Sequence, residues 1–241
     1  MLRKTLYTAS LCVAFALSAP AQAGLEEGIA AANVGDFERA VSEFQYLADK
    51  GFAPGIYELA QLYEGGFGVP KNQHKAAELY QQAVDQQYPD AMFSLAVMYQ
   101  EGRGVKVDLQ RAVELFTSAA EKGIAAAQYN LGVMYTNGEG VLKDYNAAVD
   151  WYQKAAAQNY TLAQFNLALM YYDGLGVQKS LEKSYIWNTI AEYNGNDNAS
   201  TSRKLDERKL QPEVIERAKK TADDIYQRIL AGRYVGEGRR L

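Results

Sequence analysis

Histidine and cysteine, from which most metal sites and nucleophilic pairs are built, are almost absent from this sequence. His74 is the only histidine among the 241 residues, and Cys12 is the only cysteine. From one chain we therefore expect no histidine-based metal cluster, no serine–histidine pair and no disulfide. We interpret His74 as a solvated residue in the first turn of a helix.

Paired glycines offer another kind of chemistry, because glycine-rich loops can bring backbone amides close to a phosphate. Four pairs recur, in GFGV, GRGV, GEGV and GLGV, but in none does a lysine with a hydroxyl residue follow the second glycine directly, as a phosphate loop requires. Consecutive acidic pairs such as Asp223-Asp224 do not face each other on a helix. The sequence therefore predicts no catalytic residue, no metal site and no cofactor, and the fourfold recurrence favours turns.

The glycine pairs belong to a segment that returns every 36 residues: LAQLYEGGFGV at 59–69, LAVMYQEGRGV at 95–105, LGVMYTNGEGV at 131–141 and LALMYYDGLGV at 167–177. The leucine, the small residue and the tyrosine of each copy lie on one side of a helix. Glycine just past a helix can adopt the left-handed conformation that ends it. The structural repeat glycines are Gly66, Gly68, Gly102, Gly104, Gly138, Gly140, Gly174 and Gly176.

Each loop leads into a second predicted helix. Short polar residues that can cap its first turn recur in register, at Asp36, Asn72, Asp108, Asp144 and Ser180. Small residues in the middle of this helix allow close approach, and large rings such as Phe44 and Tyr80 fill the space between hairpins. One hairpin buries too little apolar surface alone. The sequence therefore predicts an all-α fold, a right-handed superhelical solenoid of stacked antiparallel helix hairpins.

The first 23 residues have the pattern of a cleaved export signal. Arg3 and Lys4 precede an apolar run that ends near Leu17, and Ala-Gln-Ala ends at Ala23. The run is shorter than the ~20 residues of a membrane-spanning helix. We expect cleavage near Ala23, no membrane span, and a periplasmic or secreted protein. The formal charge of −4 would become −6 without Arg3 and Lys4, which argues against nucleic acid as a partner.

Internal repetition favours one elongated domain after the signal peptide 1–23. We expect a tetratricopeptide-like N-terminal capping unit at 24–52 and four repeats over 53–196, at about 53–88, 89–124, 125–160 and 161–196. A short polar helix and a long amphipathic helix that Pro212 opens are expected as C-terminal capping helices at 197–231. The residues 232–241 are expected to be a flexible tail.

The repeated residues resemble the Sel-one-like repeat family, a branch of the tetratricopeptide superfamily with a glycine-pair loop between its helices. The resemblance runs through four units, from Gly55 to about Gly195. It implies a non-catalytic bacterial adaptor that grips a protein or peptide on its concave surface. Some secreted relatives carry a disulfide in every unit and have been linked to penicillin binding and weak lactam hydrolysis. This chain lacks those cysteines, so that activity is not expected here.

One direction on the first helices, opposite the leucine–tyrosine side, corresponds to the concave wall of related arrays. The predicted partner-binding residues on it are Tyr57, Gln61, Phe93, Val97, Tyr129, Val133, Phe165, Leu169 and Tyr172. Two arrangements are open: the rings pack against the next unit's first helix, or their edges receive an amphipathic or extended peptide. Nearby acidic residues favour a partner with some basic character: Glu64, Asp90, Glu101 and Asp173.

An alternative function is an envelope protein that binds peptidoglycan or polysaccharide. Aromatic rings can stack on sugar faces, and Trp151 and Trp187 are the candidates. Both occupy second-helix positions that match Leu79 and Leu115, so we expect them in the core.

Overall fold

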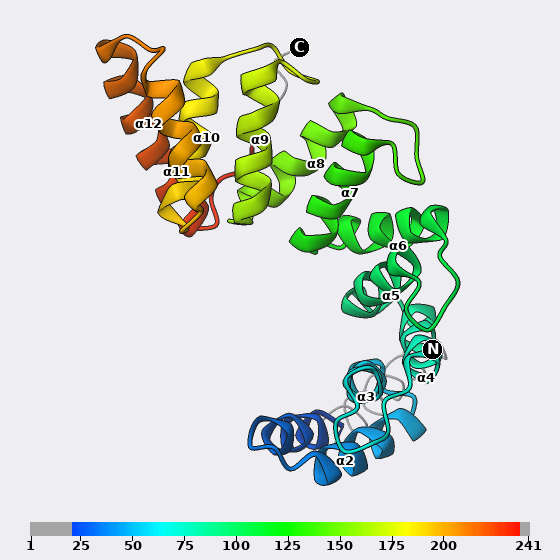
Figure 1. Cartoon of the computed structure of the whole chain (residues 1–241). Helices are drawn as coiled ribbons and strands as arrows, with labels where there is room; N and C mark the ends of the chain where they lie inside the picture. Colours follow the sequence, from blue (N-terminus) through cyan, green and yellow to red (C-terminus); the bar gives the residue numbers. More distant parts are fainter. Residues whose placement is uncertain (1–20, 237–241) are drawn as a thin grey trace, which may run out of the picture. The chain divides into compact units, whose positions relative to one another are not determined.

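The computed structural model describes residues 21–236, and in this part of the chain every regular element is a helix (Figure 1). Residues 21–33 are helical. The helices that follow are α2 (Phe37–Asp49), α3 (Ala53–Gly65), α4 (Gln73–Asp85), α5 (Pro89–Glu101), α6 (Leu109–Glu121), α7 (Ala125–Asn137), α8 (Tyr145–Ala157), α9 (Thr161–Asp173), α10 (Leu181–Tyr193), α11 (Asp197–Glu207) and α12 (Pro212–Leu230).

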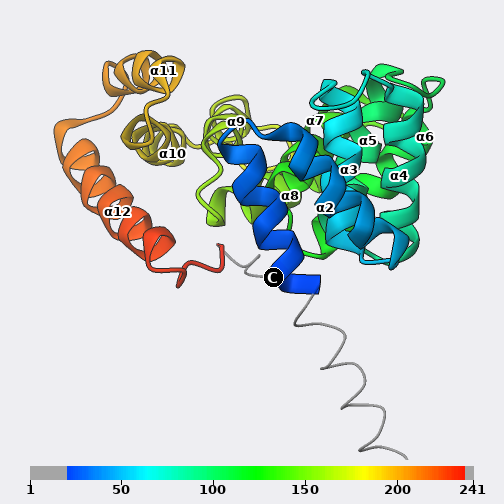
Figure 2. The same ribbon diagram turned by 90° about the horizontal axis from the view of Figure 1, so that it is seen from below.

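The chain divides after Asp108 into two compact units, which we describe separately. In unit 1, α3 packs against α2 and α4, and α4 packs against α5. In unit 2, each helix from α6 to α10 packs against the next one. The capping helices α11 and α12 both lie beside α10 (Figure 2). In the described residues, no helix is long and apolar enough to cross a membrane.

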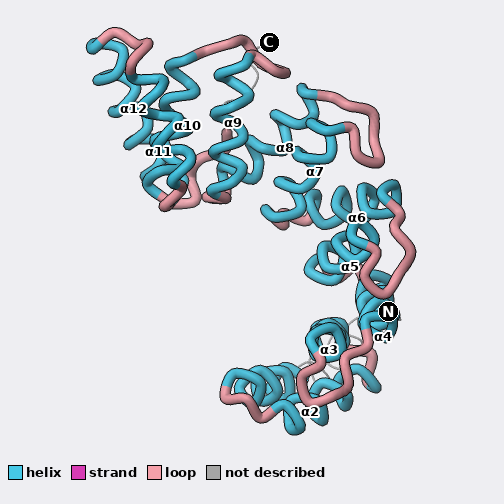
Figure 3. Tube along the Cα trace, viewed as in Figure 1, coloured by secondary structure: helices cyan, strands magenta, loops and turns pink. Residues whose placement is uncertain are grey.

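The helices reproduce the 36-residue period of the sequence. First helices begin at Ala53, Pro89, Ala125 and Thr161, and each has 13 residues. Four of the predicted caps accept a backbone hydrogen bond in the first turn of a second helix: Asp36, Asn72, Asp144 and Ser180. Glycine-pair loops join the two helices of each repeat (Figure 3).

Each pair of glycines does two different things. The first glycine, for example Gly138 with a φ of 78°, ends the first helix in the left-handed conformation. The second glycine lies against the start of the preceding second helix. A Cβ added at Gly140 would lie 2.5 Å from the carbonyl oxygen of Leu109, and one at Gly176 would lie 2.2 Å from that of Tyr145. The loops are therefore packed contacts between repeats.

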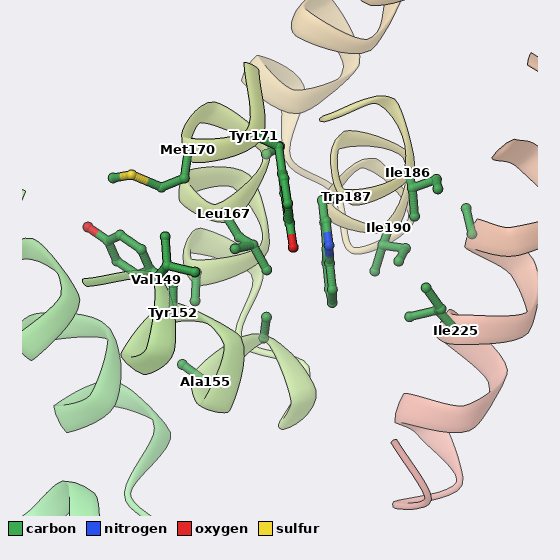
Figure 4. Packing of buried hydrophobic residues seen from close by; sticks show 14 of the residues in the cluster. Val149, Tyr152, Ala155, Leu167, Met170, Tyr171, Ile186, Trp187, Ile190 and Ile225 are labelled. Atoms are coloured by element: carbon green, nitrogen blue, oxygen red, sulfur yellow. The ribbon is translucent and has the colours of Figure 1, made fainter. Parts of the chain in front are cut away.

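Large rings and alanines fill the interior as the pattern predicts. The rings of Phe44, Tyr80, Phe116 and Tyr152 are at most 1% exposed, and the leucines at 59, 95, 131 and 167 are equally buried. In unit 2, Figure 4 shows Tyr171 beside Trp187, with Ile186 and Ile190 facing Ile225 of α12. Burying one large apolar side chain contributes about 1.5–3 kcal/mol, so the regular core accounts for the stacking of the hairpins.

Both ends of the described chain continue the packing. The helix over residues 21–33 lies beside α2 (Figure 2), and its Gly28 abuts the ring of Phe44 as Gly132 abuts Tyr152. The predicted signal peptide 1–23, with Cys12, lies outside the described residues except for 21–23, which are helical. Within the predicted flexible tail, Tyr234 is buried with its ring 5.9 Å from that of Trp187; residues 237–241 lie outside the described part.

Candidate partner-binding surface

The predicted partner-binding residues lie on the first helices and keep part of their surface open. Unit 1 contributes Tyr57 and Gln61 from α3 and Phe93 and Val97 from α5, and all four are half-buried. We call these four side chains the unit 1 surface. The same helices bury their other side, where Leu59 and Leu95 are each 1% exposed. The amphipathic division of these helices is thus the one that the sequence predicts.

Unit 2 presents the equivalent residues on α7 and α9. Four are half-buried and Leu169 is 37% exposed; together these five form the unit 2 surface: Tyr129, Val133, Phe165, Leu169 and Tyr172. The Tyr172 hydroxyl accepts a hydrogen bond from Lys209 Nζ at 2.5 Å, and Lys179 lies over the same ring. A basic environment therefore surrounds the last aromatic residue of this surface.

The surface tyrosines pack partly against other rings of their own unit. Tyr57 packs sideways against Tyr80 and Tyr88, with ring centroids 5.6 and 5.3 Å apart. Tyr129 packs in the same way against Tyr152 and Tyr160, at 6.1 and 5.2 Å. Burial raises the pKa of Tyr57 and of Tyr129. The rings are therefore held in place by their neighbours while one side of each stays accessible.

A cavity of about 440 Å³ opens between α3, α4 and α5 in unit 1. We call it the unit 1 groove. The unit 1 surface lines it together with other side chains, among them Glu64, Tyr80 and Arg103. The volume lies within the usual range for ligand pockets, and the lining mixes rings, an amide and charges. The groove thus offers room for a side chain of a bound partner.

The charges inside the groove largely satisfy one another. Glu64 accepts hydrogen bonds from Tyr80 at 2.7 Å and from Arg103, with which it forms an ion pair. Arg103 Nε also lies 2.6 Å from a carboxylate oxygen of Glu101. Burial, followed by the Glu64 carboxylate, raises the pKa of the Tyr80 hydroxyl. Two of the four acidic residues expected to attract a basic partner are therefore already paired with an arginine.

The sequence reasoning missed Glu58, which the structure brings close to Asp90. Both are half-buried, and in the described residues neither forms an ion pair with a lysine, arginine or histidine. Burial and the negative charge of Asp90 raise the pKa of Glu58 above its ordinary value. The same two carboxylates, together with burial, raise the pKa of Tyr88 to about 12. In the sequence, the only indication of a role for Glu58 is its position directly after Tyr57 on the same helix.

The other candidate residues occupy positions without a reactive arrangement. His74 is exposed in the first turn of α4, with Nδ1 3.3 Å from Glu78 Oε1. Trp187 is 2% exposed, as expected for the core, whereas Trp151 is half-buried and Lys154 Nζ lies 3.8 Å from its ring centroid. Over residues 21–236, no group of three histidine, cysteine or acidic residues is arranged to hold a metal ion.

Comparison with known proteins gives one family. A family model described as the Sel1 repeat matches residues 53–88, 89–124, 125–160 and 161–196. No curated protein matches the sequence. The likeness therefore rests on the repeats themselves and on solved structures.

Solved structures with the same fold come from several bacteria. The chain is similar to a Sel1 repeat protein from Oxalobacter formigenes, with 32% sequence identity and a TM-score of 0.66, over 70% of this chain and 49% of that one. It is also similar to a protective antigen of uropathogenic Escherichia coli strains displaying an SLR fold, with 29% identity and a TM-score of 0.56, over 93% of this chain and 57% of that one.

A putative Sel1 repeat protein from Klebsiella pneumoniae, 19% identical with a TM-score of 0.51, shares the fold over 80% of this chain and 95% of its own length. In contrast, this chain spans only about half the length of the Oxalobacter and Escherichia proteins. These likenesses confirm the predicted fold class, an all-α solenoid of stacked helix hairpins.

Proposed function

Because this chain belongs to the Sel1 repeat family, whose members are generally protein–protein interaction scaffolds, we propose that it binds a protein or peptide on its unit 1 and unit 2 surfaces. The role is binding alone, without catalysis, metal or cofactor. The observation that carries the proposal is that all nine side chains of these surfaces are partly accessible, although the repeated leucines on the other side of the same helices, Leu59, Leu95, Leu131 and Leu167, are buried. Apolar and aromatic side chains that remain accessible in this way suit the binding of an extended or amphipathic peptide.

We place the protein in the periplasm or outside the cell. Support comes from the N-terminal sequence, in which Arg3 and Lys4, an apolar run and Ala-Gln-Ala follow one another as in a cleaved export signal. Detection of a shortened chain that begins near Gly24 in a periplasmic extract tests this placement.

The experiment that tests the binding role changes one ring in each unit. The variant Phe93→Ser with Tyr129→Ser should retain less than about a tenth of the partner captured in a crosslinking pull-down from envelope extracts, because aromatic anchors dominate such interfaces. Its melting temperature should fall less steeply, since both rings are only half-buried. A matched control is Val107→Ser with Leu142→Ser, two exposed apolar residues of the glycine-pair loops. Unchanged capture by the ring variant would reject the proposal.

The alternative, a peptidoglycan- or polysaccharide-binding protein, has less support in the geometry. Trp187 is buried, and the ammonium group of Lys154 covers the Trp151 ring. Sedimentation with purified peptidoglycan separates the two functions: the scaffold stays in the supernatant, whereas the polysaccharide binder enters the pellet.

A further inference from the structure

Beside the unit 1 groove lie two carboxylates, Glu58 and Asp90, that form no ion pair with a lysine, arginine or histidine of the described residues. In the groove, Glu64 is paired with Arg103, whose guanidinium also pairs with Glu101 outside the groove. Beside it, Glu58 on α3 and Asp90 in the first turn of α5 lie close enough for the charge of Asp90 to act on Glu58. A half-buried carboxylate without a cationic neighbour is an unfavourable state that a bound cation would relieve.

Two tyrosine rings stand next to this carboxylate pair. The ring centroids of Tyr57 and Tyr88 are 5.3 Å apart. Burial, together with the charges of Asp90 and Glu58, raises the pKa of both hydroxyls. A lysine or arginine head group is attracted by the face of an aromatic ring as well as by a carboxylate. The ring of Tyr57 connects this pair with the unit 1 groove, which Tyr57 lines together with Phe93 and Val97.

Unit 2 repeats the rings without the carboxylates. Tyr129, Tyr152 and Tyr160 correspond to Tyr57, Tyr80 and Tyr88 at a distance of two repeats, and they pack in the same way. At the same distance, Asn130 replaces Glu58 and Leu162 replaces Asp90. The aromatic packing therefore does not require the acidic pair.

We propose that the unit 1 groove binds an extended peptide segment carrying a lysine or arginine next to an apolar side chain. The apolar side chain enters between Tyr57, Phe93 and Val97, and the cationic head lies between Glu58 and Asp90 against the tyrosine rings. The inference rests on the proposed function. It adds that the partner segment carries a positive charge and that unit 1 recognises this charge.

Fluorescence anisotropy with the full chain tests this assignment. The probes are two labelled short peptides with identical apolar residues, one with lysines and the other with glutamates at the remaining positions. The lysine peptide should bind about tenfold more tightly, and the preference should shrink as salt screens the charges. In Glu58→Gln with Asp90→Asn, the preference should fall to about twofold or less. The matched control, Glu78→Gln with Asp85→Asn, changes two exposed carboxylates of α4 in the same unit and should keep it.

Each other outcome overturns the assignment. Equal affinity for the two peptides, absence of binding to either, or full preference in the Glu58 and Asp90 variant would each contradict it. A further variant, Phe93→Ser, distinguishes a failure of this assignment from a failure of the proposed function. If Phe93→Ser weakens both peptides equally and no charge preference exists, the groove still binds peptides and only the basic specificity is wrong.

Discussion

Single glycines show how one residue type can serve two purposes in the same loop. The spacing of the pairs predicts left-handed turns, and the positive φ angles of Gly138 and Gly140 confirm it. The close contact of Gly140 with the backbone of Leu109 could not be predicted from the loop, because the two residues are far apart in sequence. Only the recurrence of the second glycine in all four repeats hints that a neighbour approaches.

This difference predicts unequal effects of two alanine substitutions. Gly138→Ala should cost about 1–2 kcal/mol, the strain of a left-handed alanine, because the nearest atom to its Cβ would be Lys143 Cβ at 3.4 Å. Gly140→Ala adds a clash at 2.5 Å with a backbone oxygen that cannot rotate away, and should cost at least about twice as much. Urea unfolding of the two variants measures the difference, and equal losses would show that the contact is not tight.

Charged side chains of the surface were predicted less well than apolar ones. The helical period places Tyr57, Gln61, Phe93 and Val97 on one side, and all four lie there. Which carboxylates remain unpaired depends on where Arg103 points, and a helical wheel contains no such information. The general acidity and Asp90 were therefore predictable, but the position of Glu58 beside Asp90 was not.

At the scale of elements, the capping helices contain a buried polar cluster. Asp206 of α11 is 1% exposed and accepts hydrogen bonds from Ser184 Oγ at 2.8 Å and Asn188 Nδ2 at 3.1 Å, both on α10. The sequence predicts α11 as a short polar helix and α12 as an amphipathic one, and both exist. The polar attachment of α11 escaped prediction because periodicity arguments follow apolar residues, and α11 buries only Ala199 besides Asp206.

Asp206 makes the stability of this attachment depend on pH. Burial raises the pKa of its carboxyl group, although the bonds from Ser184 and Asn188 act in the opposite direction. The folded protein therefore binds the proton more tightly than the unfolded chain. Stability is lost as pH rises through the raised pKa, and it is regained as pH falls toward the ordinary value of about 3.9.

The substitution Asp206→Asn removes this titration. Relative to the variant, the parent chain should gain free energy of unfolding between pH 7 and pH 4.5, by at most about 1.4 kcal/mol for each unit of pKa difference. Urea unfolding at the two pH values measures the difference, in which the other carboxylates cancel. Asp197→Asn, at an exposed position of the same helix, is the control. A difference between parent and variant that is the same at both pH values would contradict the burial effect.

At the scale of the whole molecule, the 36-residue period predicts most of the fold. It places the helices, the loops and the buried rings, because each hairpin repeats the same local contacts with its neighbours. The period also predicts which surface stays open, since the leucine–tyrosine side of each first helix is needed for packing. Features that break the period, such as Glu58 beside Asp90 and the α10–α11 cluster, required coordinates. Those features distinguish this chain from a generic array of its repeats.

The most direct test of the central claim is site-specific photocrosslinking. A photoreactive amino acid at Gln61 of unit 1 or Val133 of unit 2 should yield a crosslinked species of higher mass in envelope extracts. The same amino acid at Val107 or Leu142, which are exposed on glycine-pair loops, should yield none. Crosslinks from the loop positions alone, with none from Gln61 or Val133, would contradict the account that partners bind on the first helices.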